Sequence, residues 1–141
     1  MAKAIKFDHI GGPDVMYPQT VEVGDPGPGQ VRLRHLAVGL NYADTYFRNG
    51  TYPIPLPNGL GVEAAGIVEE LGEGVTQVAV GDRVTYTGFT NTLGAYSTER
   101  LIDAAPLIKL PQGISLETAA ARFGLTLIHL FSGILSPSVH I

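Results

Sequence analysis

Prolines at positions 53, 55 and 57, in the stretch TYPIPLPNG, constrain the fold of this chain more than any other feature. Proline has no backbone N–H and a fixed φ, so prolines at alternate positions exclude both a helix and a central strand. Turn-forming residues are abundant elsewhere too, with 18 glycines and 10 prolines among 141 residues. Turns must therefore interrupt the chain at short intervals, which favours many short strands over long helices.

The composition places the chain among compact folded proteins. Hydrophobic residues make up 45% and charged residues 16%, and the length is that of one domain. The sequence has no cysteine and begins without an apolar signal region, so we expect a cytoplasmic protein without disulfides. The net charge of −4 argues against a nucleic-acid partner. We also expect no membrane span, because the most apolar stretch, 119–135, contains Arg122 and His129.

Short strands are predicted throughout the first two thirds of the chain. In the stretch 30–40, Val31 and Leu33 share one face, but the apolar phase then slips to Leu36, Val38 and Leu40. Such a slip indicates a β-bulge or burial on both faces. The predicted strands cover residues 4–7, 20–23, 30–40, 62–71 and 83–86, with one more after a loop within 88–102 and a short one within 105–111. Their close spacing predicts a mainly β fold, a small and partly open barrel.

Two segments carry the signals of helices. Asn41 can cap a short helix that has Asp44 in its first turn and ends at Asn49-Gly50, and Arg48 is spaced to pair with Asp44. A C-terminal helix is predicted after Ser115. Its apolar residues recur at helical spacing at Leu116, Ala120, Phe123, Leu127, Leu130 and Ile134.

The stretch GLGVEAAG, residues 59–66, contains the G-x-G-x-x-A spacing of a dinucleotide-binding loop. That loop requires a buried strand before its first glycine and a helix N-terminus after it. Here a proline-rich loop comes before, and the β-branched pair Ile67-Val68 after it predicts a strand. The sequence therefore argues against phosphate binding at this stretch.

Several motifs together identify a family. The run LNYADTYFRNGTYPIPLPNGLGVEAAGIVEELGEGV, followed by VGDRVTY, LGAYSTER and ISLETAAA, closely resembles zeta-crystallin-like quinone oxidoreductases, a zinc-independent branch of the medium-chain dehydrogenases/reductases. The resemblance implies a GroES-like domain over residues 1–131 and a divergent tail over 132–141. It also implies NADPH-dependent reduction of a quinone or another conjugated carbonyl. In the family an NADPH-binding Rossmann domain follows, and we expect it to be absent here, because SGILSPSVHI has no glycine-rich turn.

The resemblance also implies the residues of the site. Asn41, Tyr46 and Tyr52 are the candidate catalytic residues. The candidate contacts of the cofactor are Asn41, Tyr42, Ala43, Asp44, Tyr46 and Thr126. Zinc-dependent relatives have cysteine and histidine where this chain has Asn41 and Val62, so the resemblance implies a site without zinc.

The residue types suit this chemistry, although each has a simpler structural explanation. An asparagine amide can donate to a cofactor or substrate oxygen, and tyrosines offer flat faces to a planar quinone. The N-cap role alone is enough to explain Asn41. The aromatic residues Tyr42, Tyr46 and Phe47 can be core anchors, and the Thr126 hydroxyl can bond to its own helix. The four histidines show no metal-ligand spacing, which favours surface or hydrogen-bonded structural histidines.

Three functions follow from these observations. The first is a metal-free quinone oxidoreductase reduced to its substrate-side domain, and the sequence leaves open whether this chain turns over alone. The second is a non-enzymatic GroES-like module that forms homodimers or other oligomers through its terminal helix. The third is an enoyl reductase-type reaction on the same scaffold.

Overall fold

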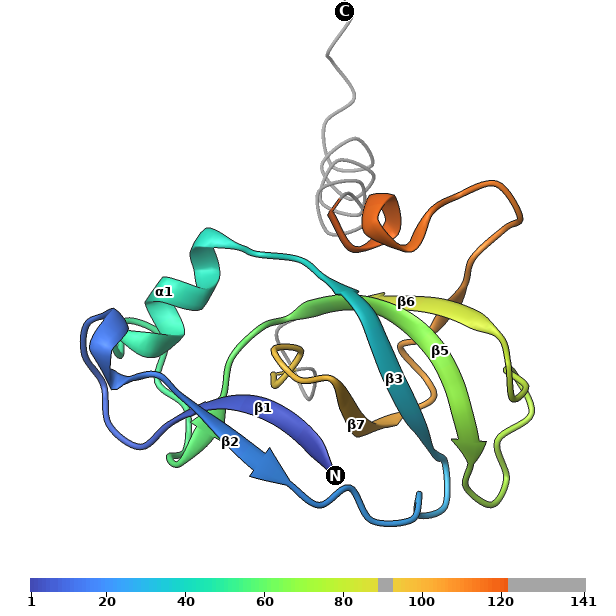
Figure 1. The fold of residues 1–141 in the computed structure, drawn as a ribbon, viewed down its shortest axis with the longest axis horizontal. Coiled ribbons are helices and arrows are strands. Elements are labelled where there is room, and N and C mark those ends of the chain that lie inside the picture. The colour runs from blue at the N-terminus through green and yellow to red at the C-terminus, as the bar shows by residue number, and fades with distance from the viewer. Residues whose placement is uncertain (89–92, 122–141) are drawn as a thin grey trace, which may run out of the picture.

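The computed structural model describes residues 1–88 and 93–121, and its fold is mainly β (Figure 1). The strands and helices follow one another as β1 (Ala2–Phe7), the 3₁₀ helix η1 (Pro13–Val15), β2 (Tyr17–Val21), β3 (Gln30–Val38), α1 (Tyr42–Arg48), β4 (Asn58–Gly59), β5 (Glu63–Leu71), β6 (Arg83–Thr87), β7 (Glu99–Asp103) and β8 (Ile108–Lys109). A further helix begins at residue 116 and is described as far as residue 121.

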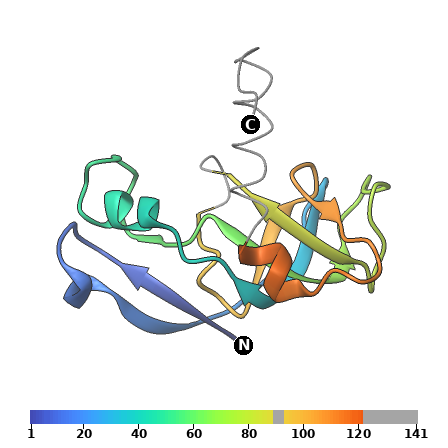
Figure 2. The same ribbon diagram turned by 90° about the horizontal axis from the view of Figure 1, so that it is seen from above.

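The strands form two antiparallel sheets. Three strands pair in the order β2-β1-β4, and five pair in the order β7-β3-β5-β6-β8. An isolated bridge between Ala4 and Ser97 joins the two sheets, and β1 also contacts β7. The sheets curve around each other without closing within the described residues, as the two views show (Figures 1 and 2). The predicted partly open barrel is confirmed.

The longest strand, β3, contains the predicted irregularity. Its pairing with β5 shifts register between Arg32 and Leu33 and again between His35 and Ala37. Val31 and Leu33 are fully buried before the shifts. Leu36 and Val38 are exposed after them, so the prediction of a bulge is confirmed, and burial on both faces is not observed.

Two clusters make up most of the core. One is formed mostly by side chains of the five-stranded sheet, among them Leu33, Val84 and Tyr86. The other packs Phe7 of β1 against Phe47 of α1 and Val62, and it attaches the helix to the three-stranded sheet. Ile54 and Leu56 pack against this second cluster while the prolines that flank and separate them are exposed, so the predicted proline loop lies on the surface but is anchored.

Most local predictions agree with the structure, and two are wrong. The strand expected over 20–23 is β2, which starts earlier, at Tyr17, and pairs with β1 over its whole length. The expected Asp44–Arg48 ion pair is not made, because Asp44 is buried whereas Arg48 donates to the carbonyl oxygen of Gly11. Ser115 caps the second helix as predicted, with its Oγ 3.1 Å from the N–H of Thr118. The helix positions predicted beyond residue 121 lie outside the described residues.

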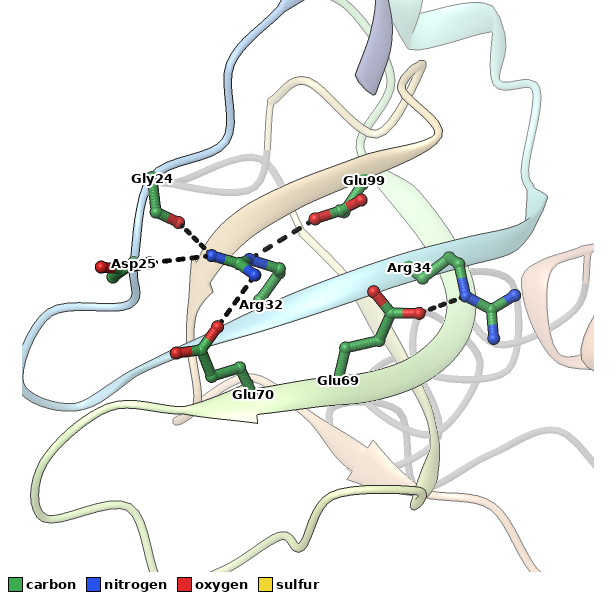
Figure 3. Close-up of polar contacts among 7 residues, drawn as sticks. All are labelled: Gly24, Asp25, Arg32, Arg34, Glu69, Glu70 and Glu99. Atoms are coloured by element: carbon green, nitrogen blue, oxygen red, sulfur yellow. Dashed lines mark hydrogen bonds and ion pairs between the residues drawn. The ribbon is translucent and has the colours of Figure 1, made fainter. Parts of the chain in front are cut away.

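Arg32 connects three strands and a loop (Figure 3). Its guanidinium pairs with Glu70 of β5 at 2.9 Å and with Glu99 of β7 at 3.4 Å. It also donates to the carbonyl oxygen of Gly24 and pairs with Asp25, at 2.9 and 3.2 Å. Arg34, two residues further along the same face of β3, makes a single ion pair with Glu69. Arg32 therefore holds the loop before β3 against the five-stranded sheet.

Candidate functional site

Helix α1 places the residues expected to form the site. It begins with a capping box, in which the Asp44 carboxylate accepts the backbone N–H of Asn41 at 2.9 Å. The N–H of Asp44 donates in turn to the carbonyl oxygen of Asn41 at 3.0 Å. The helix is short, and Phe47 anchors its inner face in the core. These contacts fix Asn41 at the point where β3 passes into α1.

The Asn41 side chain lies next to a buried acid. Its Nδ2 donates to Glu63 Oε2 at 3.2 Å, and Glu63 is almost fully buried at the start of β5. A side-chain amide nitrogen carries two hydrogens, and this bond uses one of them. Glu63 therefore orients the amide. Within the described residues the second hydrogen makes no further hydrogen bond, so it is a candidate donor for a ligand.

Three tyrosines line the outer side of α1 and the loop after it. The rings of Tyr42 and Tyr46 lie 5.3 Å apart, edge to face, and Tyr46 and Tyr52 repeat the same spacing. Tyr42 is 76% exposed and Tyr52 45%. Neither residue is a core anchor, and of the aromatic residues on α1 only Phe47 is buried. The helix and the loop after it thus present aromatic side chains at the surface, on the helix that Asn41 caps.

The structure brings together all but one of the predicted site residues. Asn41, Tyr42, Ala43, Asp44 and Tyr46 lie in or next to α1, and Tyr52 joins them through its ring contact with Tyr46. Ala43 packs against the core, and Asp44 is buried, so these two support the helix from inside. Thr126 lies outside the described residues.

Sequence reasoning missed Tyr96. Its hydroxyl donates to Asp44 Oδ2 at 2.7 Å, so the same carboxylate oxygen accepts both Tyr96 and the Asn41 N–H. Burial and the hydrogen bond to Asp44 raise the pKa of Tyr96 well above its usual range, which keeps the phenol protonated as a donor. The only sequence signal was the motif LGAYSTER, which marks the loop but not the direction of its tyrosine.

The GLGVEAAG stretch has a structural use. A strand, β5, follows its second glycine, as predicted, in place of the helix that a pyrophosphate site requires. Gly61 has φ +89°, and a Cβ atom there would lie 2.6 Å from Cδ1 of Tyr96 and 2.8 Å from its backbone nitrogen. The glycine therefore allows the Tyr96 loop to approach closely.

Among the described residues, no group of three or more His, Asp and Glu side chains lies close enough to hold a metal ion. At the two positions where the resemblance implies zinc ligands in relatives, Asn41 bonds to Glu63 and Val62 is buried in an apolar cluster. A membrane-spanning helix was likewise not found in residues 1–88 and 93–121.

Comparison with known proteins identifies the family. The model of the alcohol dehydrogenase GroES-like domain matches residues 27–112, more than half of the chain. The chain belongs to this family.

Individual relatives are more specific. Over 122 residues this chain is 50% identical to a quinone oxidoreductase of Pseudomonas aeruginosa, an alignment that covers 86% of this chain and 37% of the relative. It is also 51% identical to a 2-haloacrylate reductase of Burkholderia, over 83% of this chain and 36% of that protein.

The crystal structure of Escherichia coli quinone oxidoreductase complexed with NADPH superimposes with a TM-score of 0.85 at 44% identity, and the match covers 92% of this chain and 40% of that one. The chain thus spans about 40% of the length of the relatives that it matches. The agreement in fold confirms the predicted GroES-like domain.

Proposed function

We propose that this GroES-like domain forms the substrate side of an NADPH-dependent quinone oxidoreductase. The observation that carries the proposal is the array of Tyr42, Tyr46 and Tyr52 on and after the helix that Asn41 caps. Planar aromatic faces and a donor fixed by a buried acid suit a flat acceptor with carbonyl oxygens. Relatives named quinone oxidoreductase, at 50% and 45% identity, support the same assignment.

The described residues fit one end of NADPH. The flat faces of the tyrosine array suit the planar ring of the nicotinamide. The pyrophosphate has no comparable partner here, because Gly59–Gly66 leads into a strand and not into a helix N-terminus. We propose that Asn41, Tyr42, Ala43, Asp44, Tyr46 and Thr126 border the nicotinamide end, and that the rest of the cofactor requires a second domain.

NADPH, when bound, supplies the hydride that reduces a conjugated carbonyl. In our proposal the rings and hydroxyls of Tyr46 and Tyr52 hold the acceptor, and the Asn41 amide donates to the acceptor oxygen, where negative charge develops. Holding two reactants in line contributes several kcal/mol in well-oriented cases, up to about 7–11. Orientation and hydrogen bonding are thus the contributions that this chain can make.

We propose that the reaction needs no zinc. The reason is the chemistry of the donors, since neither the asparagine amide nor the valine side chain at the two positions can replace thiolate and imidazole. Glu63 is already engaged with Asn41, and we assign it no proton transfer.

Quinone-dependent oxidation of NADPH tests the proposal in a fusion of this chain to the nucleotide-binding domain of a close relative. We expect the fusion to reduce quinones and Asn41→Ala, Tyr46→Phe and Tyr52→Phe to lower kcat/KM. Tyr17→Phe is the matched control, because its exposed hydroxyl bonds only to Asp8 among the described residues. A folded fusion without activity, or variants that match the control, would contradict the proposal.

A second acceptor class has support of its own. The relative named 2-haloacrylate reductase is as similar to this chain as the quinone oxidoreductases are. A haloacrylate also carries a double bond conjugated to a carbonyl group, so the enoyl reductase-type reaction stays a candidate. Comparing kcat/KM for a quinone, a 2-haloacrylate and an enoyl thioester in the same fusion decides between these acceptors.

The remaining expectations concern location and assembly. We propose a cytoplasmic protein on its lack of cysteine, and self-association as a homodimer or larger oligomer. The terminal helix expected to mediate it lies mostly outside the described residues. Sedimentation of the chain separates the alternatives, since a saturating oligomer without NADPH binding would favour the non-enzymatic binding module.

A further inference from the structure

Tyr96 reaches the candidate site from a distant part of the sequence. It belongs to the loop before β7, and its hydroxyl meets Asp44 across 52 residues. Asp44 is 6% exposed, and within the described residues its Oδ1 has no hydrogen-bond partner. The two hydrogen bonds on Oδ2, from Tyr96 and from the Asn41 N–H, are therefore what holds this carboxylate in place.

The Tyr96 loop is itself rigidly attached. The backbone N–H of Tyr96 donates to Leu60, and its carbonyl oxygen accepts from Ile5 of β1 at 2.8 Å. Its ring packs on Gly61, where the absence of a side chain leaves room for it. The neighbouring Ser97 carbonyl accepts from His35, which is buried in β3. Both sheets therefore determine where the hydroxyl lies.

We propose that Tyr96 is a positioning residue of the candidate site. Its hydroxyl holds the Asp44 carboxylate, Asp44 holds the backbone of Asn41, and the Asn41 amide is thereby directed at the ligand. This inference rests on the proposed function for its catalytic consequence. It also explains the glycine at position 61, because Gly61 lets Tyr96 approach α1.

Amide hydrogen exchange in the 141-residue chain tests the structural half without any activity. Tyr96→Phe keeps the ring on Gly61 and removes only the hydroxyl, so the variant is expected to fold. We expect exchange of the Asn41 N–H to rise about tenfold, which corresponds to about 1.4 kcal/mol, within the range of a single hydrogen bond. The side-chain amide signals of Asn41 should shift too, while core amides of β6 stay unchanged.

Tyr17→Phe is the matched control for this measurement, because Tyr17 also donates to a carboxylate, that of Asp8, at 2.8 Å. It should leave Asn41 unchanged. Equal Asn41 signals in Tyr96→Phe and Tyr17→Phe would overturn the proposal. A general rise in exchange that includes β6 would also overturn it, because it would indicate a role in overall stability alone.

Kinetics in the fusion test the catalytic half. If Asn41 donates to charge that develops in the transition state, Tyr96→Phe lowers kcat and kcat/KM together by about tenfold, with KM unchanged. In an Asn41→Ala background it should have no further effect, and independent effects would contradict action through Asn41. An inactive wild-type fusion would refute the proposed function, and the exchange measurement would still decide the position of Tyr96 in the site.

Discussion

At the residue scale, both ring nitrogens of the buried His35 have hydrogen-bond partners. Its Nδ1 lies 2.8 Å from the Ser97 carbonyl oxygen and its Nε2 3.1 Å from the Tyr86 hydroxyl. A carbonyl only accepts, so Nδ1 carries the hydrogen and Nε2 accepts from tyrosine. Burial, opposed by the bond to Ser97, lowers the pKa of His35 to about 4. The histidine is a structural residue, as its lack of ligand spacing predicted.

This lowered pKa predicts a pH dependence of stability. In the unfolded chain a histidine takes up its proton near pH 6.5, but the folded protein takes it up only near pH 4, so lowering the pH through this window favours unfolding. We expect the free energy of unfolding to fall by about 2 kcal/mol between pH 7 and pH 5. Urea denaturation at both values measures it. The same decrease in His35→Gln would contradict the assignment.

Gly61 predicts a second effect at this scale. Gly61→Ala combines a positive φ with a collision against Tyr96, whereas Gly74→Ala shares the positive φ of +80° and meets nothing within 4 Å. We expect Gly74→Ala to cost about 1 kcal/mol and Gly61→Ala about 2–4 kcal/mol. Denaturant midpoints of the two variants measure the difference. Equal costs would show that the contact with Tyr96 adds nothing to the loss of unfolding free energy in Gly61→Ala.

At the scale of elements, Arg32 attaches the loop at Gly24 and Asp25 to the five-stranded sheet. Its Nε lies 3.4 Å from Glu99, at ion-pair distance but without the geometry of a hydrogen bond, while both terminal nitrogens are closely paired (Figure 3). Its side chain is 23% exposed, so the solvent screens these pairs only in part. One cation faces three carboxylates, and removing it leaves them to repel one another.

We therefore expect Arg32→Met to lower the free energy of unfolding by about 1–3 kcal/mol. Arg34→Met is the matched control: Arg34 makes a single, more exposed pair with Glu69, and its loss should cost about 0–1 kcal/mol. Denaturation at low and high salt measures both. The deficit of Arg32→Met should shrink at high salt, because salt screens the remaining carboxylates. A deficit equal to that of the control would show that the connection is not stabilising.

At the scale of the whole molecule, the NADPH binding that we propose requires more contacts than the described residues offer. The chain spans about 40% of the length of its relatives, and its one glycine-rich match to a dinucleotide loop leads into β5. A micromolar Kd corresponds to about −8 kcal/mol and a millimolar one to about −4 kcal/mol. We expect the Kd of this chain to lie nearer the second value, because the stretch Gly59–Gly66 offers the pyrophosphate no helix N-terminus.

Calorimetric titration with NADPH, with Asn41→Ala in parallel, is the corresponding measurement. We expect the 141-residue chain to bind in the millimolar range or more weakly, and its fusion to a nucleotide-binding domain about a thousandfold more tightly. Saturable micromolar binding by the chain alone, weakened in Asn41→Ala, would contradict this expectation and place a complete cofactor site within this chain.

Sequence reasoning succeeded where the physical cause is local. The prolines at 53, 55 and 57 exclude regular structure by their own geometry, Asn41 and Asp44 form a capping box three residues apart, and the phase slip in β3 predicts its bulge. The predicted start of β2 is three residues too late. The extent of this strand is set by its pairing with β1, which the residues of β2 alone do not reveal.

The sequence by itself determined the fold class, the cap of α1 and the failure of GLGVEAAG as a phosphate loop, since each depends on neighbouring residues. The tertiary structure alone decided that Asp44 faces Tyr96 and not Arg48, and that His35 faces Tyr86. These partners are 52 and 51 residues apart. Their meeting depends on strand register and on the packing of both sheets, which no local pattern encodes.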